Sequence, residues 1–303
     1  MKPPVRPGLA AIVAAELASP VPPPVAAVAE AARAAHGPGV GAVLFYGSCL
    51  RDGYHDGLMV DLYLLADDYA AVHGGPLMRW LNRLIPPNVY YVETRHDGGV
   101  VRAKYALVSL PQFERLAGPG TRNPYFWARF AQPTGLVWAR DAAVAGRVRD
   151  ALGQAIATTA AAVLPLVGEE ADAEALWVRA LSESYRTELR AEGPERARTI
   201  VGHDRERYRQ VTAALRAGEG LPVRESPAQA RRRWRRRRIE GKALSVLRLV
   251  KAAFTFAGGG DYLAWKISRH AAVPVEFKPW ERRHPLLAAP FVLWRLGRRG
   301  VVR

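Results

Sequence analysis

The sequence FYGS at residues 45–48 is followed, after a polar loop, by MVDLYLLADD at residues 59–68. Both segments are rich in apolar, β-branched or aromatic residues, which predicts two neighbouring strands. Because glycine has no Cβ, the Gly47-Ser48 turn can bring backbone N–H groups and a hydroxyl close to a chain of phosphates. Asp61 places one carboxylate within the second strand, where it can hold Mg²⁺ against the same phosphates. This combination is typical of a nucleotidyltransferase site, although a Gly-Ser pair by itself is often a plain turn.

Length and composition limit the classes of protein. The chain has 303 residues, 49% of them hydrophobic, so it can bury a substantial core and divide into two domains. No run of about 18 or more apolar residues is free of charge, and the apolar stretch near the N-terminus lacks a cleavage signal. The single cysteine, Cys49, excludes an internal disulfide and a cysteine-based zinc site, and we expect it to pack rather than to act as a nucleophile. These features predict a cytoplasmic protein.

The positive charge is concentrated at the C-terminal end. Residues 1–150 carry 15 basic and 12 acidic side chains, residues 151–223 carry 9 and 11, and residues 224–303 carry 20 and 5. Most of the net charge of +16 therefore lies in the last region. Such clustering indicates an anionic partner surface.

The hydrophobic pattern predicts an α+β fold, in which a small mixed-sheet nucleotidyltransferase domain is followed by a mainly helical domain and a basic amphipathic C-terminal segment. We expect strands at Val40–Tyr46, Met59–Ala66, Val89–Thr94 and Val100–Ser109, with a hairpin turn at His96–Gly99. We expect helices at Val25–Ala35, Tyr69–Leu84, Asp141–Leu166, Ala171–Ala191, Glu195–Ala217 and Ile239–Phe256. The predicted regions are residues 1–38 (Pro/Ala-rich segment and helix), 39–120 (nucleotidyltransferase domain), 121–223 (helical domain) and 224–303 (basic, membrane-associating region).

The C-terminal region combines arginines with tryptophans. Residues 231–238 read RRRWRRRR, after a stretch that we expect to be flexible, and we expect this run to be exposed. The segment Pro285–Arg299 has the composition of an interfacial helix, with an apolar stretch and arginines near its end. The residues predicted to contact an anionic membrane are Arg231, Arg232, Arg233, Trp234, Trp280, Phe291, Trp294 and Arg298. A solvated tail, a packing helix or a nucleic-acid contact are the alternatives, but the apolar stretch favours lipid over nucleic acid.

Two blocks of sequence carry a resemblance to a known family. The first block consists of Tyr46-Gly47-Ser48, Met59-Val60-Asp61, Asp67-Asp68 and His73, and the second of Val89-Tyr90-Tyr91, Asp97-Gly98 and Lys104-Tyr105. In these blocks the chain resembles the mitochondrial-type phosphatidate cytidylyltransferases, the translocator assembly and maintenance family, which make CDP-diacylglycerol from CTP and phosphatidic acid. Looser matches at Arg129–Pro133 and Leu181–Arg190 extend the resemblance over residues 40–255.

The chain departs from the family pattern at identifiable positions. Cys49 stands where the family usually has a glycine after Gly-Ser, and Thr187-Glu188 replaces a Gly-Asp pair while keeping a carboxylate. Met59 occupies the position of the first aspartate in many nucleotidyltransferases, but methionine there is this family's own pattern. After residue 255 there is little that matches, so the membrane interpretation of the tail depends on its composition.

The resemblance implies a role for each matching residue. Tyr46, Gly47, Ser48 and Tyr91 would bind the nucleotide, Asp61 and Lys104 would be catalytic, and Asp61 with Asp68 would hold Mg²⁺. Tyr185, Glu188 and Arg190 would reach the site from a helix of the second domain. Asp67, Asp68 and Glu93 are all candidates for the second metal ligand, although Asp67-Asp68 could instead cap a helix. A salt-bridged helix surface would also explain the residues of the second domain.

The expected function is therefore that of a CTP:phosphatidate cytidylyltransferase that uses Mg²⁺ and binds peripherally to the inner face of the membrane. Its partners would be CTP, phosphatidic acid and an anionic membrane surface. Two alternatives remain open: a nucleotidyltransferase with RNA or a small molecule as acceptor, and a non-catalytic basic adaptor with the same fold. The sequence gives no indication of the oligomeric state.

Overall fold

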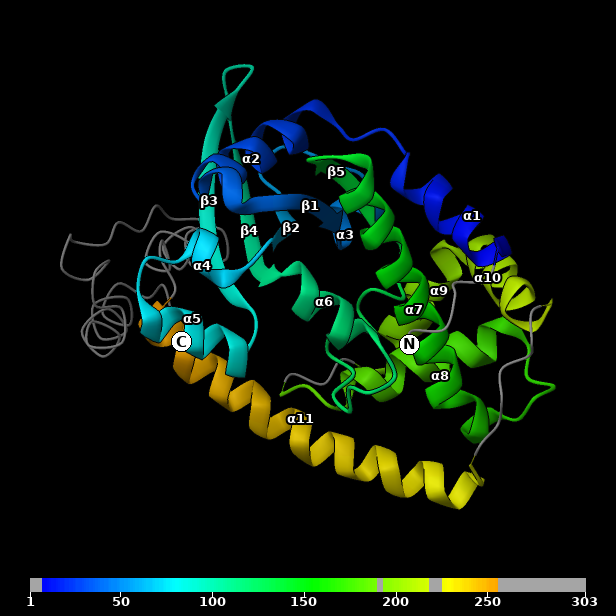
Figure 1. The fold of residues 1–303 in the computed structure, drawn as a ribbon. Helices are drawn as coiled ribbons and strands as arrows, with labels where there is room; N and C mark the ends of the chain where they lie inside the picture. The colour runs from blue at the N-terminus through cyan, green and yellow to red at the C-terminus, as the bar shows by residue number, and fades with distance from the viewer. Residues whose placement is uncertain (1–6, 190–192, 218–224, 256–303) are drawn as a thin grey trace, which may run out of the picture.

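The computed structural model describes residues 7–189, 193–217 and 225–255. The predicted site residues Arg190, Trp280, Phe291, Trp294 and Arg298 lie outside the described residues. Within the described part, one mixed sheet is followed by a largely helical region, so the predicted α+β class is confirmed (Figure 1).

The sheet has five strands in the order β3-β4-β2-β1-β5. Their bounds are β1 (Val40–Tyr46), β2 (Met59–Ala66), β3 (Asn88–His96), β4 (Gly99–Ser109) and β5 (Gly135–Ala139). The pair β2–β4 is parallel, and the other pairs are antiparallel. Strands β1 and β2 begin and end where the sequence predicts, and apart from Asp61 they are apolar because both faces of the sheet are covered. Asp97 and Gly98 both have positive φ, 47° and 78°, as a two-residue hairpin turn requires.

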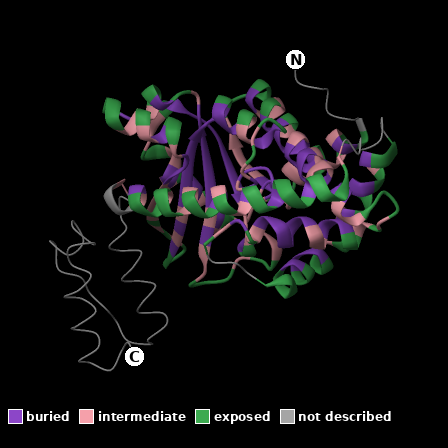
Figure 2. Ribbon diagram, turned by 90° about the horizontal axis from the view of Figure 1, so that it is seen from below, coloured by how far each residue is buried: buried purple, intermediate pink, exposed green. Residues whose placement is uncertain are grey.

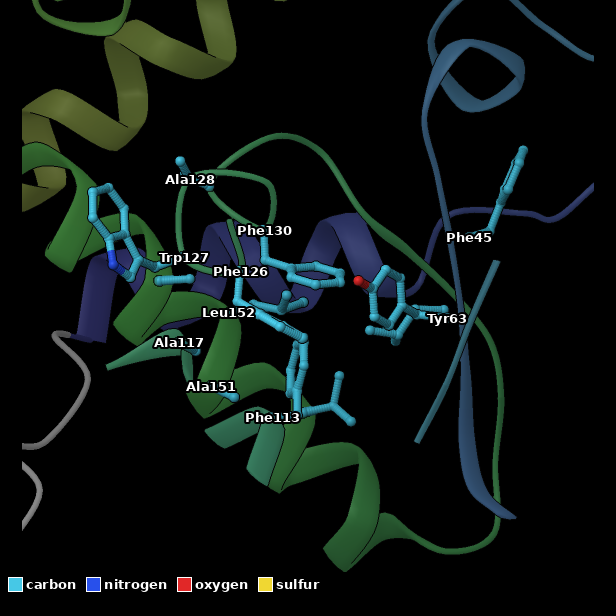
Figure 3. Close-up of a cluster of buried hydrophobic side chains, with 14 of the residues drawn as sticks. Phe45, Tyr63, Phe113, Ala117, Phe126, Trp127, Ala128, Phe130, Ala151 and Leu152 are labelled. Atoms are coloured by element: carbon cyan, nitrogen blue, oxygen red, sulfur yellow. The ribbon is translucent and has the colours of Figure 1, made fainter. Parts of the chain in front are cut away.

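One face of the sheet packs on an aromatic cluster. Tyr63 of β2 meets Phe126 and Phe130 at ring-centroid distances of 6.0 and 5.0 Å, and Phe113 lies 4.7 Å from Phe130 (Figure 3). Phe113 belongs to helix α6 (Leu110–Ala117), and the other two phenylalanines belong to the segment 122–133. Helix α2 (Pro23–Ala34) lies against β3 and β4. The cluster joins the sheet to the helical region without a linker.

The helical region is built around α7 (Ala142–Val167). Helices α1 (Pro7–Leu17) and α8 (Ala173–Tyr185) pack on α7, and α9 (Pro194–His203) and α10 (Arg205–Ala217) complete the layer. In the described part of the chain, α7 alone is long and apolar enough to cross a membrane, but most of its apolar stretch is buried inside the protein. This burial is typical of the central helix of a packed domain.

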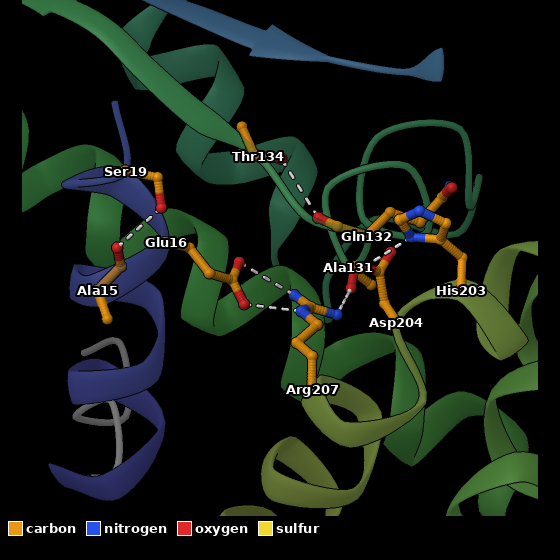
Figure 4. Close-up of polar contacts among 9 residues, drawn as sticks. All are labelled: Ala15, Glu16, Ser19, Ala131, Gln132, Thr134, His203, Asp204 and Arg207. Carbon is orange, nitrogen blue, oxygen red and sulfur yellow. Dashed lines mark hydrogen bonds and ion pairs between the residues drawn. The ribbon is translucent and has the colours of Figure 1, made fainter. Parts of the chain in front are cut away.

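An ion pair connects α1 and α10 to residues 122–133, which we call the aromatic segment. Glu16 of α1 accepts hydrogen bonds from Arg207 of α10, with oxygen–nitrogen distances of 2.7 and 3.3 Å (Figure 4). Nη1 of Arg207 also donates to the carbonyl oxygen of Ala131 at 2.7 Å. One buried guanidinium therefore holds three segments that are far apart in the sequence.

Several predicted boundaries are wrong. The helix expected over residues 69–84 is two helices, α4 (Tyr69–Val72) and α5 (Pro76–Leu84), because Gly74, Gly75 and Pro76 interrupt it. The helix expected over residues 195–217 is likewise divided into α9 and α10. Strand β5 was not predicted, and it pairs with β1, so the sheet continues beyond the domain boundary expected at residue 120.

Helix α11 (Pro227–Thr255) contains the arginine run. The stretch before this run, expected to be flexible, forms its first turn from Pro227 onward. Trp234 is 1% exposed, its ring lies edge-on to Trp127 at 6.0 Å, and its Nε1 donates to the carbonyl oxygen of Ala162 at 2.9 Å. The prediction that Trp234 contacts a membrane is therefore wrong, because its indole packs in the protein core. Arg231, Arg232 and Arg233 are exposed, as expected.

Candidate active site

Four predicted site residues form a row across the sheet. Tyr46 of β1 is opposite Asp61 of β2, Asp61 is beside Lys104 of β4, and Lys104 is opposite Tyr91 of β3. Residues paired in this way project from the same face of a sheet. Nζ of Lys104 lies 3.1 Å from Oδ1 of Asp61. The strand register thus brings together residues that are separated by up to 58 positions in the sequence.

The glycine turn fits closely over the carboxylate. Gly47 has φ of 89°, and a Cβ at this position would lie 2.9 Å from Oδ2 of Asp61. The backbone conformation favours glycine, and a Cβ here would push against the Asp61 carboxylate. Ser48 begins the short helix α3 (Ser48–Arg51) directly after the turn. Cys49 is buried and its Sγ donates to the carbonyl oxygen of Met59 at 3.2 Å, in agreement with a packing role.

The facing wall comes from the helical region. Arg129 stacks on Tyr46 and Tyr125, with its guanidinium carbon 5.5 and 4.9 Å from the two ring centroids. Nη2 of Arg129 lies 3.8 Å from Oε1 of Glu188. Tyr185 is the last residue of α8, so Glu188 follows that helix and is not part of it, contrary to the predicted helix over residues 171–191.

A cavity of about 250 Å³ lies between these walls. The predicted residues that line it are Tyr46, Gly47, Ser48, Asp61, Tyr185 and Glu188, and the three arginines that join them are Arg51, Arg129 and Arg196. Three guanidinium groups beside two carboxylates make a site suited to a polyphosphate with a bound cation. Sequence reasoning included Arg129 only within a loosely matching motif, and it did not find Arg51 or Arg196.

Burial controls the ionisation of the tyrosine at this site. Burial, with a smaller contribution from the charge of Asp61, raises the pKa of Tyr46 to about 12. Tyr46 is therefore a neutral phenol at neutral pH. It can donate a hydrogen bond to a phosphate oxygen, and it offers its ring face to Arg129.

Asp68 is not part of this site. It lies at the other end of β2 from Asp61, roughly 20 Å away at the rise of an extended strand. Its Oδ1 accepts a hydrogen bond from the backbone nitrogen of Ala70 at 2.7 Å and caps α4. Asp67 pairs with Arg140 at 2.5 Å. The prediction that Asp68 and Asp61 share one metal ion is wrong, because the strand separates them, and helix capping explains Asp68.

Three other predicted residues, Lys104, Tyr91 and His73, are not among the residues that line the cavity. In the sheet, Lys104 of β4 lies next to Asp61, and Tyr91 of β3 lies opposite Lys104. The hydroxyl of Tyr91 donates to Oε2 of Glu93 at 3.0 Å. His73 is buried, with its Nε2 2.6 Å from Nδ2 of Asn82, so it packs between α4 and α5.

The residues present fit Mg²⁺ only together with a phosphate ligand. In residues 7–189, 193–217 and 225–255, no three Asp, Glu, His or Cys side chains gather into a potential metal cluster. Proteins usually hold Mg²⁺ through one or two carboxylates plus substrate phosphates and water. Asp61 and Glu188 can supply those carboxylates from the two walls of the cavity.

The fold and the site define an α+β protein with a cavity lined by carboxylates and arginines between its sheet and its helical layer. No protein-family model matches the chain, and no curated protein matches it. Among solved structures, a nucleotidyltransferase-like protein from Exiguobacterium sibiricum 255-15 aligns over 92% of each chain, with 13% sequence identity and a TM-score of 0.28. This similarity is too low to assign an activity, so the functional argument depends on the site.

Proposed function

We propose that the protein is a Mg²⁺-dependent nucleotidyltransferase with its active site at Asp61. The observation that carries this proposal is the close contact of the Gly47 turn with Asp61 in a cavity whose other wall holds Arg129. The turn, the strand carboxylate and a cationic wall are the three elements that hold and activate a nucleoside triphosphate.

Each residue of the site has a role in this reaction. The backbone and hydroxyl at Gly47-Ser48 bind the phosphate chain, and Asp61 with Glu188 would hold Mg²⁺. When bound, Mg²⁺ supplies positive charge against the phosphate oxygens. Arg129 donates to the β- and γ-phosphates and stabilises the pyrophosphate as it leaves. Lys104 keeps the Asp61 carboxylate oriented across the strand pair, at 3.1 Å.

We further propose that the nucleotide is CTP and the acceptor is phosphatidic acid, so that the product is CDP-diacylglycerol. The support for these substrates is the resemblance of the two motif blocks to the phosphatidate cytidylyltransferases. Strand pairing places residues from both blocks side by side in the sheet, with Tyr46 and Asp61 from the first block and Lys104 and Tyr91 from the second. A volume of about 250 Å³ is below the range of roughly 300 to 1,000 Å³ usual for ligand pockets. The cavity therefore suits the phosphates, and the base and the acceptor would lie outside it.

Incubation of the purified full chain with labelled CTP, Mg²⁺ and phosphatidic acid vesicles tests this function. We expect labelled CDP-diacylglycerol and one pyrophosphate for each product. Pyrophosphate release with RNA or a small alcohol, but not with phosphatidic acid, would support a nucleotidyltransferase activity. It would show that phosphatidic acid is not the acceptor. No transfer to any of these acceptors, by protein that is folded and bound to vesicles, would contradict the proposed activity.

An exposed apolar surface supports the proposed location at a membrane. Leu77, Trp80 and Leu84 of α5 are 65%, 58% and 54% exposed, and Leu249 of α11 is 62% exposed. The same two helices bury a polar pair between them: Nζ of Lys251 donates to Oδ1 of Asn82 at 2.9 Å. Figure 2, which views the molecule from the side of α11, shows exposed residues along the outer side of this helix. The two helices therefore bury polar groups where they meet and expose apolar side chains. Exposed apolar side chains are suited to an apolar partner such as a bilayer.

Replacing Trp80 with Asp should weaken binding to phosphatidic acid vesicles by about tenfold or more, because it removes an inserted indole and adds a charge that anionic lipid repels. Vesicle flotation measures this change. Val100→Asp is the matched control, since Val100 is 39% exposed at the tip of the β3–β4 hairpin and receives the same new charge. If the two variants bind equally well, α5 is not the membrane surface.

A further inference from the structure

A second hollow lies between α11 and the loop at residues 119–122. Its volume is about 520 Å³. Its charged lining consists of Arg122 from the loop and Arg232, Arg233, Arg236, Arg237 and Glu240 from α11. The spacing of the α11 residues places them along one side of that helix. This hollow shares no lining residue with the cavity at Asp61.

The charges of this hollow are not balanced within the described residues. Glu240 lies 2.7 Å from Arg236 and 3.7 Å from Arg122, and Arg233 pairs with Glu225. In the described part of the chain, Arg232 and Arg237 have no carboxylate within ion-pair distance. One lining carboxylate therefore faces five guanidinium groups. Like charges held this close repel one another, so a bound anion would stabilise the arrangement.

Arg237 is the most constrained of these arginines. It is 7% exposed, its guanidinium carbon lies 5.3 and 4.8 Å from the rings of Trp127 and Trp234, and its Nε donates to the carbonyl oxygen of Arg122 at 3.0 Å. Its Nη1 is buried without a hydrogen-bond partner among the described residues. Burial and the nearby Arg233 lower the pKa of Arg237 to about 10, so it still carries its charge at neutral pH. A buried cation with an unused donor is costly unless an acceptor reaches it.

We propose that this hollow is a binding site for a phosphate-bearing anion with two or more negative charges, held by Arg122, Arg232 and Arg236, with Arg237 beneath them. Guanidinium groups bind phosphate oxygens through pairs of parallel hydrogen bonds, so several of them around one hollow can hold a phosphomonoester or a diphosphate. The phosphate can belong to a free anion or to a lipid headgroup, since both present the same oxygens. The site is independent of the proposed nucleotidyl transfer at Asp61.

Calorimetric titration of the full chain with inorganic pyrophosphate tests the free-anion form. Arg232→Ala combined with Arg236→Ala should weaken binding at this hollow by about tenfold or more, because each arginine contributes charge-assisted hydrogen bonds. The matched control is Arg231→Ala combined with Arg235→Ala, which removes the same charge from the same run at exposed positions that do not line the hollow. This control should change the affinity by less than about twofold. Pyrophosphate can also enter the Asp61 cavity, so both titrations are repeated with Arg129→Ala present, which should weaken binding at that second site and leave binding at the hollow unchanged.

Flotation with vesicles containing phosphatidic acid tests the lipid form with the same two double variants. If the hollow takes a lipid headgroup, the Arg232/Arg236 variant should bind these vesicles about tenfold more weakly than the Arg231/Arg235 variant. If it takes a free anion, the difference should appear only with pyrophosphate. Equal effects of both double variants with both probes would overturn the proposal, because they would indicate a diffuse basic surface. Circular dichroism should give the same unfolding temperature for both variants, since all four side chains are exposed.

Discussion

Asp61→Asn is expected to lower the rate of nucleotidyl transfer on the order of a hundred- to a thousandfold or more, as removal of one preorganised electrostatic group does in other active sites. The amide has nearly the shape of the carboxylate, so it preserves the close contact with the Gly47 turn. It carries no charge, however, and cannot serve as an anionic ligand for Mg²⁺. The substitution also removes the negative charge that lies 3.1 Å from the Lys104 ammonium.

Pyrophosphate release with CTP and phosphatidic acid vesicles measures the loss. The unfolding temperature should change little, because the side chains of Asp61 and Lys104 are 25% and 37% exposed and such pairs contribute at most about 1 kcal/mol. Asp68→Asn is the matched control: it makes the same chemical change at the other end of β2, and asparagine still caps a helix. Retained activity in Asp61→Asn, or an equal loss in Asp68→Asn, would remove Asp61 from its proposed role.

The contrast between Asp61 and Asp68 illustrates how far the sequence predicts this site. Strand periodicity locates β1 and β2 from local composition alone, and it places Tyr46 and Asp61 near strand ends. Which strands are neighbours is a non-local property, so the sequence did not show that Lys104 and Asp61 are adjacent through a parallel pairing. Asp68 matches the family pattern in the sequence, but it lies seven positions after Asp61, at the other end of β2.

The facing wall of the cavity was harder to predict. Arg129, Glu188 and Arg196 come from three separate segments, and no local period relates them to the glycine turn. These three residues line one cavity because of how α8 and α9 pack against the aromatic segment. The sequence pattern does not predict this tertiary packing.

The burial of Trp234 was predicted wrongly for a related reason. Seven arginines around one tryptophan dominate the composition of residues 231–238, and this composition predicts an exposed surface. The helical spacing of Ala230, Trp234, Arg237 and Gly241 nevertheless defines one side of α11, and each of these residues is buried. A Cβ on Gly241 would lie 2.6 Å from the carbonyl oxygen of Thr187, so this side packs closely against the segment that leads to Glu188. Arginines occupy the positions between these buried residues. The composition of the run therefore does not reveal that one face of the helix belongs to the core.

Arg207→Ala is expected to lower the free energy of unfolding by roughly 3 to 5 kcal/mol, the cost of leaving one partner of a buried ion pair uncompensated. The side chains of Arg207 and Glu16 are only 12% and 19% exposed. Removing the guanidinium leaves the Glu16 carboxylate and the Ala131 carbonyl without their donor in a site with little access to water (Figure 4). Urea unfolding monitored by circular dichroism measures the change. Arg205→Ala on the same helix should cost less than about 1 kcal/mol, because its partner Glu174 and Arg205 itself are half exposed.

A double variant distinguishes the effect of losing the Glu16–Arg207 charge pair from the effect of losing side-chain packing at these two residues. Glu16→Leu combined with Arg207→Met replaces both ions with apolar side chains of similar length, and such replacements are often neutral or stabilising. We therefore expect the double variant to recover most of the stability that Arg207→Ala loses. It should not recover the position of the Ala131 carbonyl, which accepts a hydrogen bond from the Arg207 guanidinium at 2.7 Å. Arg129 is two residues away on the same segment, so the double variant should remain stable yet bind nucleotide more weakly, with a raised KM for CTP. A stable double variant with an unchanged KM would show that the aromatic cluster alone fixes this wall of the cavity.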